Sequence, residues 1–392
     1  MRRWLLLAGY LLLASIAAVQ QWSLHRPDDP YTHYNNYIIF RQAYEHLVRG
    51  EDIYVQYLAE HWDYFRYSPS FAVAFGALAW MPDVAGLLLW NTLNAAVLFL
   101  AVWTLTTGAF RDERLRAAAG WFVAIEMMTA LQNAQSNVLI AGLVILAFTA
   151  LEHRRVAAAT LLLVAAAFIK PFALVGFSLC LFSPRRKPVI QWSLTWTAII
   201  AALPLLAVTP AQLLELYASW WQLLSMDFGD SAGLSVMGFL ASWFQLTPPK
   251  VVVDLAGAGL FCWPLALGVL NGDRSRDAGY RLLMLANVLV WVVIFNHKAE
   301  SSTYIIAICG VAVWLFAQQR TRSNVMLATL ALIFTSLSPT DLFPRSLAAS
   351  VIDPYVIKAV PCILIWLKIT YDLVDRQVSP SRVFRESLDP SP

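Results

Sequence analysis

Charge is scarce in this sequence, and its scarcity argues against an ordinary water-soluble protein. Asp, Glu, Lys and Arg make up 14% of the 392 residues, whereas 59% of the residues are hydrophobic. Soluble globular proteins have about 25% charged residues and about 45–50% apolar ones. A soluble bundle of buried helices would need far more charge to cover its surface. The composition therefore predicts a membrane protein.

Cysteine is scarce as well, and the four cysteines all lie inside apolar runs, at Cys180, Cys262, Cys309 and Cys362. Disulfides are therefore not expected, and the spacing of these residues matches no metal site. We interpret them as buried thiols that act as small hydrophobic side chains.

Motifs that bind nucleotides or nucleic acids are missing too. The sequence has no phosphate-binding glycine loop, no Asp-x-Asp pair and no dinucleotide fingerprint. The triplet "DFG" at 227–229 lacks every other part of the kinase signature. No basic tract resembles a nucleic-acid-binding arm. We therefore expect no nucleotide-dependent active site and no nucleic-acid partner.

Apolar segments separated by short polar breaks occupy almost the whole chain instead. Because a helix of about 20 apolar residues crosses the hydrocarbon core, the pattern predicts an all-α, polytopic membrane helix bundle of about 12 spans. The first segment, 4–21, has no small-x-small cleavage site, so we expect a retained anchor rather than a signal peptide. We expect a single transmembrane domain over 1–375 and a cytoplasmic tail over 376–392.

Basic residues cluster in the breaks between these segments. The clusters are Arg2–Arg3, Arg111/Arg114/Arg116, Arg154–Arg155, Arg185–Arg186–Lys187, Arg274/Arg276/Arg281, Arg320/Arg322 and the stretch from Lys368 to Arg385. Placing all of them in the cytoplasm pairs the apolar segments without contradiction. The topology predicts a cell (inner) membrane protein with both termini in the cytoplasm. Its extracytoplasmic parts are 22–68, 209–250, 339–354 and the polar stretch 295–301.

The first outer loop contains a predicted amphipathic helix in "NNYIIFRQAYEHLVRG", residues 35–50, with Gly50 as its stop. Its apolar face consists of Tyr37, Phe40, Tyr44, Leu47 and Val48. We expect this helix to lie on the membrane surface with that face toward the lipid. Further on, two hairpins of short apolar limbs have polar apices, "QNAQSN" at 132–137 and "FIKPF" at 168–172. Such backbone is tolerated at membrane depth only where it lines a cavity.

Ionisable groups near the hydrocarbon are functional candidates by default. Lys170, which precedes Pro171, either snorkels to the outer interface or faces a cavity to hold a phosphate. His297 and Lys298, beside Glu300, are interpreted as contacts to a phosphate or pyrophosphate through charge-assisted hydrogen bonds. Glu126 is either protonated and hydrogen-bonded in the interior or lines a polar cavity.

Several of these segments together resemble glycosyltransferase family 87, polytopic enzymes of the GT-C fold that use polyprenyl-phosphate sugars and include bacterial α-mannosyltransferases and an arabinofuranosyltransferase. The resemblance covers residues from about 30 to about 310 in the same order. The matching stretches are "NNYIIFRQAYEHLVRGEDIY", "FRYSPSFAVAFGALAWMP", "LLLWNTLNAAVLFL", "QNAQSNVLIAGLVILAF", "AAAFIKPFALVGF" and "FNHKAESSTYII".

The resemblance implies an inverting transfer of a mannose-like or other hexose or pentose sugar from a polyprenyl-phosphate donor. The acceptor would be an extracytoplasmic glycan or glycolipid of the cell envelope, and membrane lipids would be further partners. It implies no cofactor, and the loop acids leave a divalent cation open without any ligand spacing to argue for one. The donor phosphate would contact Lys170, His297, Lys298 and Arg66. The substrate cavity would include Gln132, Gln135, Asn137, Glu126, Glu300 and Tyr67.

One departure from the family concerns the catalytic base. The family usually has an acid just before the aromatic run of the first outer loop, and Asn36 stands at that position here. An amide is no useful proton acceptor, so the base would come from Asp29, Glu60 or Asp63. Most acids of this loop are interpreted as solvated.

Two other classes compete with an enzyme. A transporter or lipid flippase would also have broken helices and intramembrane charges, but it predicts related halves, and the sequence shows no convincing ones. A structural membrane protein would leave the clustered polar groups unexplained.

Overall fold

The computed structural model describes residues 1–392 except 27–28, 30, 228–231 and 376–392. Every regular element in the described part is helical, so the predicted all-α bundle is confirmed. The expected tail, 376–392, and most of the "DFG" triplet lie outside the described residues.

The elements follow the predicted apolar segments closely. The first half contains α1 (Arg2–Leu24), α2 (Asn35–Val48), α3 (Pro69–Ala79), α4 (Asp83–Thr104), η1 (Gly108–Arg111), α5 (Glu113–Gln132), α6 (Asn137–Glu152), α7 (Val156–Ile169) and η2 (Pro171–Phe182). The second half contains α8 (Arg186–Ala202), η3 (Leu203–Leu206), α9 (Pro210–Asp227), α10 (Val236–Phe244), α11 (Lys250–Leu270), α12 (Gly272–Arg276), α13 (Ala278–Ile294), η4 (Ser301–Thr303), α14 (Tyr304–Phe316), α15 (Arg322–Leu330), η5 (Ala331–Leu337), α16 (Arg345–Leu347), η6 (Ala348–Ile352) and α17 (Val360–Asp375).

Four helices of the described chain are long and apolar enough to cross a membrane by themselves: α1, α4, α8 continued by η3, and α11. Their outward faces suit lipid, since Ile190, Leu194 and Ile199 on α8 expose 60%, 66% and 52% of their surface. The other apolar helices are shorter, at 10–17 residues. The number of about 12 spans stays a prediction.

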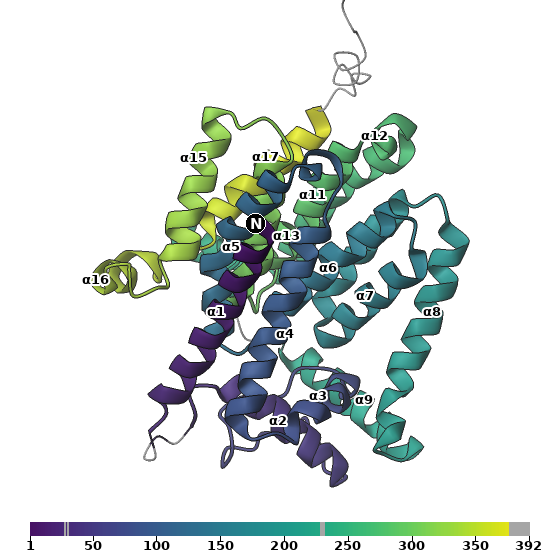
Figure 1. Ribbon diagram of the computed structural model, residues 1–392, viewed down its shortest axis with the longest axis vertical. Coiled ribbons are helices and arrows are strands. Elements are labelled where there is room, and N and C mark those ends of the chain that lie inside the picture. The colour runs from purple at the N-terminus through teal and green to yellow at the C-terminus, as the bar shows by residue number, and fades with distance from the viewer. Residues whose placement is uncertain (27–28, 30, 228–231, 376–392) are drawn as a thin grey trace, which may run out of the picture.

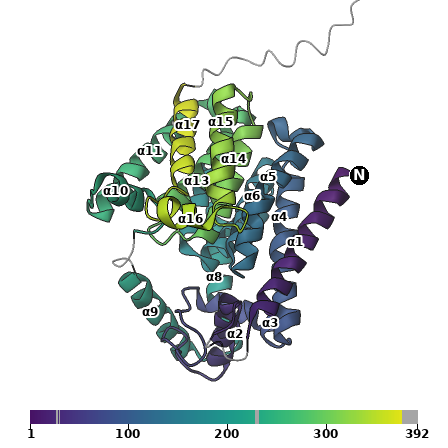
Figure 2. The ribbon, with the colours of Figure 1, turned by 90° about the vertical axis from the view of Figure 1, so that its left-hand side faces the viewer.

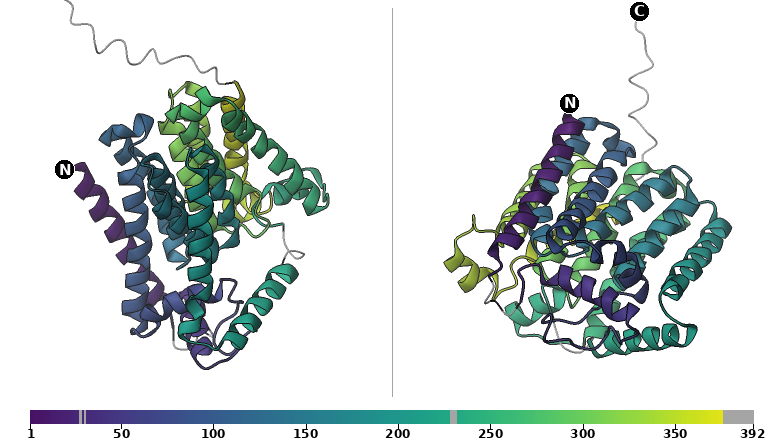
Figure 3. Two further views of the ribbon diagram at one scale, coloured as in Figure 1. Left: turned by 90° about the vertical axis from the view of Figure 1, so that its right-hand side faces the viewer. Right: turned by 60° about the horizontal axis from the view of Figure 1, so that its bottom comes forward.

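The bundle has two chemically different ends. At one end Arg281 pairs with Glu152 at 2.6 Å, and Arg274 donates to the carbonyl of Leu373 at 3.1 Å. The opposite end contains α2, α3 and α9 (Figures 1 and 2). Helix α1 runs along the outside of the bundle from the first end to the second (Figure 3). Basic residues from the clusters at 154–155, 185–187 and 274–281 therefore share one end of the bundle.

Helix α2 is the predicted amphipathic helix, and Gly50 follows it with a φ of +76°, a conformation that favours glycine. Of the five residues expected to face lipid, three are covered by protein instead, Tyr44 is half-buried, and Val48 exposes 49% of its surface. Tyr37, Phe40 and Leu47 are buried by protein, and the Phe40 ring lies 5.3 Å from Phe75 of α3 between centroids. Aromatic pairs of this geometry add to the apolar burial, so α2 packs firmly onto α3 and α4.

Helices α13 and α14 form the centre of the bundle. All residues from 282 to 290 and from 304 to 315 are buried. Gly310 allows this close packing, because a Cβ there would lie 2.9 Å from the carbonyl oxygen of Ala286. The polar stretch 295–303 joins the end of α13 to the start of α14, and it lies on the side of the bundle that contains α2.

Candidate functional site

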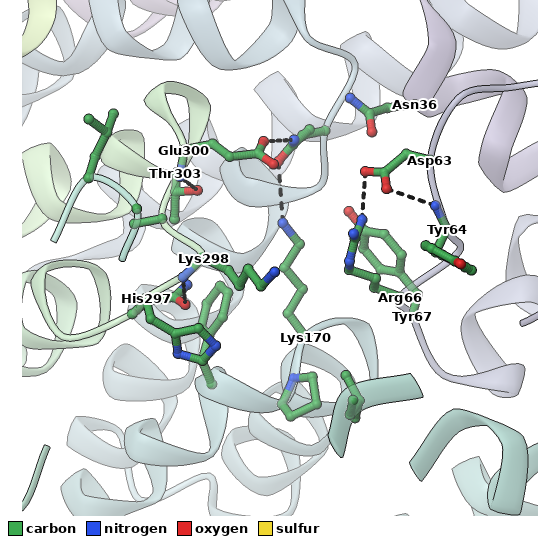
Figure 4. Close-up of a pocket in the computed structure, with 18 of the residues that line it drawn as sticks. Asn36, Asp63, Tyr64, Arg66, Tyr67, Lys170, His297, Lys298, Glu300 and Thr303 are labelled. Carbon is green, nitrogen blue, oxygen red and sulfur yellow. Dashed lines mark hydrogen bonds and ion pairs between the residues drawn. The ribbon is translucent and has the colours of Figure 1, made fainter. Parts of the chain in front are cut away.

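A cavity of about 840 Å³ opens among the predicted polar segments. It lies between the first loop, the two hairpin apices and the stretch 296–303 (Figure 4). The predicted site residues that line it are Asn36, Asp63, Arg66, Tyr67, Gln135, Lys170, His297, Lys298 and Glu300. Segments far apart in the sequence therefore converge on one site.

The chain reverses direction at Ala134, in the turn between α5 and α6, and this turn directs the Gln135 side chain into the cavity. Ala134 has a φ of +49°, a left-handed conformation that is unusual for a residue other than glycine. Trp90 holds this turn by donating its indole N–H to the Ala134 carbonyl at 2.8 Å. Gln135 then donates to Glu300 Oε2 at 2.6 Å. Gln132, before the reversal, donates to Gln20 of α1 at 2.7 Å instead and does not line the cavity, contrary to the prediction.

Lys170 enters the cavity because Pro171 ends α7. The residue before a proline avoids the helical region, and Lys170 is extended with φ −137° and ψ 122°. Its Nζ donates to Asn137 Oδ1 at 2.9 Å and to Gln135 Oε1 at 3.3 Å, and it lies 5.5 Å from the centre of the Tyr67 ring. The lysine points into the site rather than snorkelling along the outside (Figure 4).

The electrostatic surroundings of Lys170 change its proton affinity. Lys170 lies between α7 and η2, outside both helices. Burial lowers the pKa of Lys170 to about 8; the Glu300 carboxylate opposes this change, and Arg66 adds to it. The lysine is therefore a cation that titrates just above neutral pH.

Asn137 stands behind this part of the cavity rather than in its lining. It is fully buried, and its Nδ2 donates to Gln135 Oε1 at 2.7 Å while its Oδ1 accepts from Lys170. One buried amide thus fixes both polar side chains that reach the cavity from the hairpin apices.

The stretch 296–303 forms the opposite wall. Gly233 packs directly against it, because a Cβ at Gly233 would lie 2.5 Å from the His297 carbonyl oxygen. Leu234 donates its backbone N–H to Ala299 at 2.9 Å. Glu300 is the N-cap of η4 and forms a capping box with Thr303, whose Oγ1 accepts from the Glu300 N–H at 3.2 Å. This wall presents His297, Lys298 and Glu300 to the cavity (Figure 4).

The first outer loop supplies the third wall. Asp63 accepts from Arg66 Nη1 at 2.5 Å and from the Tyr64 N–H at 2.8 Å. The Trp220 indole of α9 donates to the Arg66 carbonyl at 3.2 Å, so α9 supports the loop. Asn36 donates its amide to the Asn133 carbonyl at 2.8 Å and lies near Asp63 in Figure 4.

Of the three carboxylates predicted as bases, Asp63 lines the cavity and the other two do not. Glu60 faces His46, with Oε2 2.9 Å from Nε2. Asp29 lies 3.7 Å from His33 Nε2. Both belong to the network that holds the first loop together, so the structure does not support them as bases at this site.

Glu126 also lies away from the cavity, contrary to its predicted place there. Its side chain is fully buried within α5, and Oε1 accepts from Lys358 Nζ at 2.9 Å. Lys358 additionally donates to the Thr335 carbonyl at 2.7 Å. Sequence reasoning missed Lys358 because its partner lies 232 positions away.

The cavity has a slight excess of positive charge. Arg66, Lys170 and Lys298 face Asp63 and Glu300, which leaves one formal positive charge. Sequence reasoning missed further lining residues, namely Tyr64, Phe172, Leu224, Leu234, Ser301 and Thr303. No single stretch of the sequence identifies these residues as a group, because they come together only in the folded chain. Among the described residues, no three His, Cys, Asp or Glu side chains converge in a way that could hold a metal ion.

Comparison with known families gives one match. The sequence model of glycosyltransferase family 87 matches residues 65–340, more than half of the chain. This region includes Arg66, Lys170 and the stretch 296–303, whereas Asn36 and Asp63 precede it. No curated protein matches the chain.

Proposed function

Because the chain belongs to glycosyltransferase family 87, a family of membrane glycosyltransferases, we propose that it transfers a sugar from a polyprenyl-phosphate donor to a glycan or glycolipid acceptor. Membership in the family supports the reaction class, which is glycosyl transfer. The donor, the acceptor and the residue roles below are our proposal.

The observation that carries the donor assignment is the convergence of three cations on one cavity. Lys170, Lys298 and Arg66 reach it from three separate segments (Figure 4). Lysine and arginine are the side chains that bind phosphate best. The isoprenoid chain of such a donor would lie in the bilayer while its phosphate occupies the cavity. A lipid-linked donor therefore suits a membrane bundle better than a water-soluble donor would.

The proposed reaction is a single displacement. An acceptor hydroxyl attacks the anomeric carbon of the donor sugar as the bond from that carbon to the phosphate oxygen breaks. The hydroxyl proton passes to Asp63, which lines the cavity as a carboxylate. Polyprenyl phosphate leaves, and attack from the opposite face inverts the anomeric centre.

The cations act on the leaving group, and the remaining polar groups act on the sugar. Negative charge grows on the departing phosphate, where the donor-phosphate residues, Lys170, Lys298, Arg66 and His297, would stabilise it. Glu300 and Gln135, joined by a 2.6 Å hydrogen bond, would bind sugar hydroxyls. In this proposal, side chains neutralise the negative charge of the departing phosphate. We therefore assign no cofactor and expect transfer to continue in the presence of a chelator of divalent cations.

The side of the membrane on which the site lies is inferred from the distribution of basic residues. Basic residues favour the cytoplasmic side, and the cavity lies at the end of the bundle away from the basic clusters. We therefore place the site on the extracytoplasmic face of the inner membrane, with both termini in the cytoplasm. The acceptor would be a cell-envelope glycan or glycolipid, and the family resemblance favours a mannose-like sugar.

The test is transfer by the purified full-length protein in lipid nanodiscs. Radiolabelled polyprenyl-phosphate mannose, or the corresponding arabinose donor, would be supplied with envelope glycan and glycolipid acceptors. We expect label in an acceptor together with an equal amount of released polyprenyl phosphate. Transfer from a nucleotide sugar alone would overturn the donor assignment. Movement of the intact lipid-linked sugar across the bilayer, without transfer, would support the flippase alternative.

A further inference from the structure

A second cavity lies at the opposite end of the bundle from the candidate site. Its volume is about 550 Å³. It is formed where α6, η2 and α11 end and where α8 and α13 begin. In Figure 1, α12 marks this end at the top, whereas α2 and α9 mark the end with the candidate site at the bottom.

Arginines from segments that are far apart in the sequence converge on this cavity, which we call the arginine cavity. They are Arg154, Arg186, Arg276 and Arg281, and among the lining residues that the structure describes the one acid is Glu152. The lining thus has a formal charge of +3, compared with +1 in the candidate site. Bringing like charges together is unfavourable unless an anion offsets their repulsion.

Glu152, the one acid among the described residues of the lining, is already engaged. Glu152 accepts from Arg281 Nε at 2.6 Å and from Arg281 Nη2 at 2.8 Å, a two-point pair that uses both of its oxygens. Within the part of the chain that the structure describes, no side-chain hydrogen bond or ion pair engages the guanidinium groups of Arg154, Arg186 and Arg276. Three guanidinium groups are therefore available to an external anion.

Besides Ser183, Pro184, Gly272 and Ser275, the remaining wall of the arginine cavity is made of large apolar side chains. They are Phe148, Leu151, Leu179, Leu181, Phe182 and Val269. Phe182 packs closely on α11, since a Cβ at Gly268 would lie 2.8 Å from its ring. Leu181 in this wall exposes 45% of its surface, and Leu270, which follows the lining residue Val269 in the chain, exposes 85%. Apolar surface thus continues from the cavity to the outside of the bundle.

A role as topology signals accounts for the sign of these arginines but not for their convergence. Arg111 and Arg114 serve as a comparison, because they belong to the same set of basic clusters and are exposed, as the arginines at 154, 186 and 276 are, but do not line the cavity. A cavity that combines guanidinium groups with an apolar wall has the two chemistries of an anionic phospholipid. Arginine suits the phosphate because its planar fork matches two phosphate oxygens.

We propose that the arginine cavity binds the phosphate headgroup of an anionic phospholipid, with the acyl chains along the apolar wall. Basic pockets between membrane helices bind such headgroups on the cytoplasmic side. The bound lipid would join the ends of α6, η2, α11 and α13 and would stabilise that end of the bundle. This site depends on membrane residence and is independent of the sugar-transfer reaction.

The experiment measures thermal unfolding of the purified full-length protein in a neutral detergent. Phosphatidylglycerol, phosphatidylcholine and inorganic phosphate are titrated separately. We expect phosphatidylglycerol to raise the unfolding temperature more than phosphatidylcholine and inorganic phosphate do at equal concentration. An equal effect of phosphatidylcholine would overturn the charge recognition, and an equal effect of inorganic phosphate would replace the lipid with a free anion.

The variants locate the binding. Arg186→Gln/Arg276→Gln should weaken phosphatidylglycerol binding by about thirtyfold, and either single variant by about fivefold, because each basic residue near an anionic lipid contributes on the order of 1 kcal/mol. Arg111→Gln/Arg114→Gln removes the same charge outside the cavity and should leave binding unchanged. Unchanged binding in the cavity variants, or equal weakening in the control, would overturn the proposal.

Discussion

Replacement of Lys170 by Met is the perturbation that isolates the cation proposed to act on the departing phosphate. Methionine keeps much of the length of the side chain and removes its charge. Lys170 Nζ contacts Asn137 and Gln135 at 2.9 and 3.3 Å, so the substitution changes one wall of the cavity and leaves the other walls intact.

The expected loss follows from known effects of groups that stabilise developing charge. Removing one such donor lowers kcat by about 10²–10³, or about 2.7–4 kcal/mol. In the proposed complex, Lys298 and Arg66 would remain beside the phosphate in the variant. We therefore expect a loss near the lower limit, about 100-fold in kcat.

The assay is single-turnover transfer from a radiolabelled polyprenyl-phosphate sugar, with chromatographic separation of donor and product. Lys187→Met is the matched control, because Lys187 is exposed and does not line the cavity. Thermal unfolding must be measured alongside, because the variant leaves the Asn137 oxygen without its donor, at a penalty of about 1–3 kcal/mol. Lys170→Arg restores a cation and should recover part of the rate.

Two results would refute this reasoning. The first is a folded Lys170→Met protein with the native transfer rate. The second is an equal loss of transfer in Lys187→Met, which would show that charge anywhere on the protein, rather than charge in the cavity, sets the rate.

Three further predictions concern the base, the pH dependence and the buried ion pair. Asp63→Asn should reduce kcat by about 10²–10⁴, as expected for loss of a general base. Glu60→Gln should retain transfer in the same assay. A larger loss of kcat in Glu60→Gln than in Asp63→Asn would assign the base to Glu60. Because the pKa of Lys170 is lowered to about 8, its charged form is lost as pH rises through that value. Hence kcat/KM should fall above pH 8, and Lys170→Arg should move this fall to higher pH; an identical profile in both proteins would contradict the assignment. Glu126→Ala should destabilise the fold by about 3–5 kcal/mol, because it leaves Lys358 buried without its carboxylate. Thermal unfolding should show partial recovery in Glu126→Gln/Lys358→Met, and no recovery would argue against the pairing.

Helix positions were accessible from the sequence because they depend on local signals. Apolar segments end at prolines, glycines and basic clusters, so α1, α4 and the two hairpins lie where the pattern predicts them. Lys170 was identifiable for the same reason, since Pro171 forces an extended residue at a polar apex.

Contacts between distant segments were not accessible in that way. Gln132 and Gln135 are three positions apart, yet the reversal at Ala134 sends one to α1 and the other to Glu300. The Gln135–Glu300 bond joins residues 165 positions apart, and nothing in either segment specifies the other. The apolar face of α2 was assigned to lipid because periodicity shows that a face is buried without showing what buries it.

The most direct test of the donor assignment is a cryo-electron microscopy structure of the full-length protein in nanodiscs with a non-transferable polyprenyl-phosphate sugar analogue. We predict density for the phosphate within hydrogen-bonding distance of Lys170 Nζ, with the sugar beside Asp63. A cavity at Lys170 without ligand density, together with a donor phosphate bound elsewhere, for example among Arg154, Arg186 and Arg276, would contradict the account.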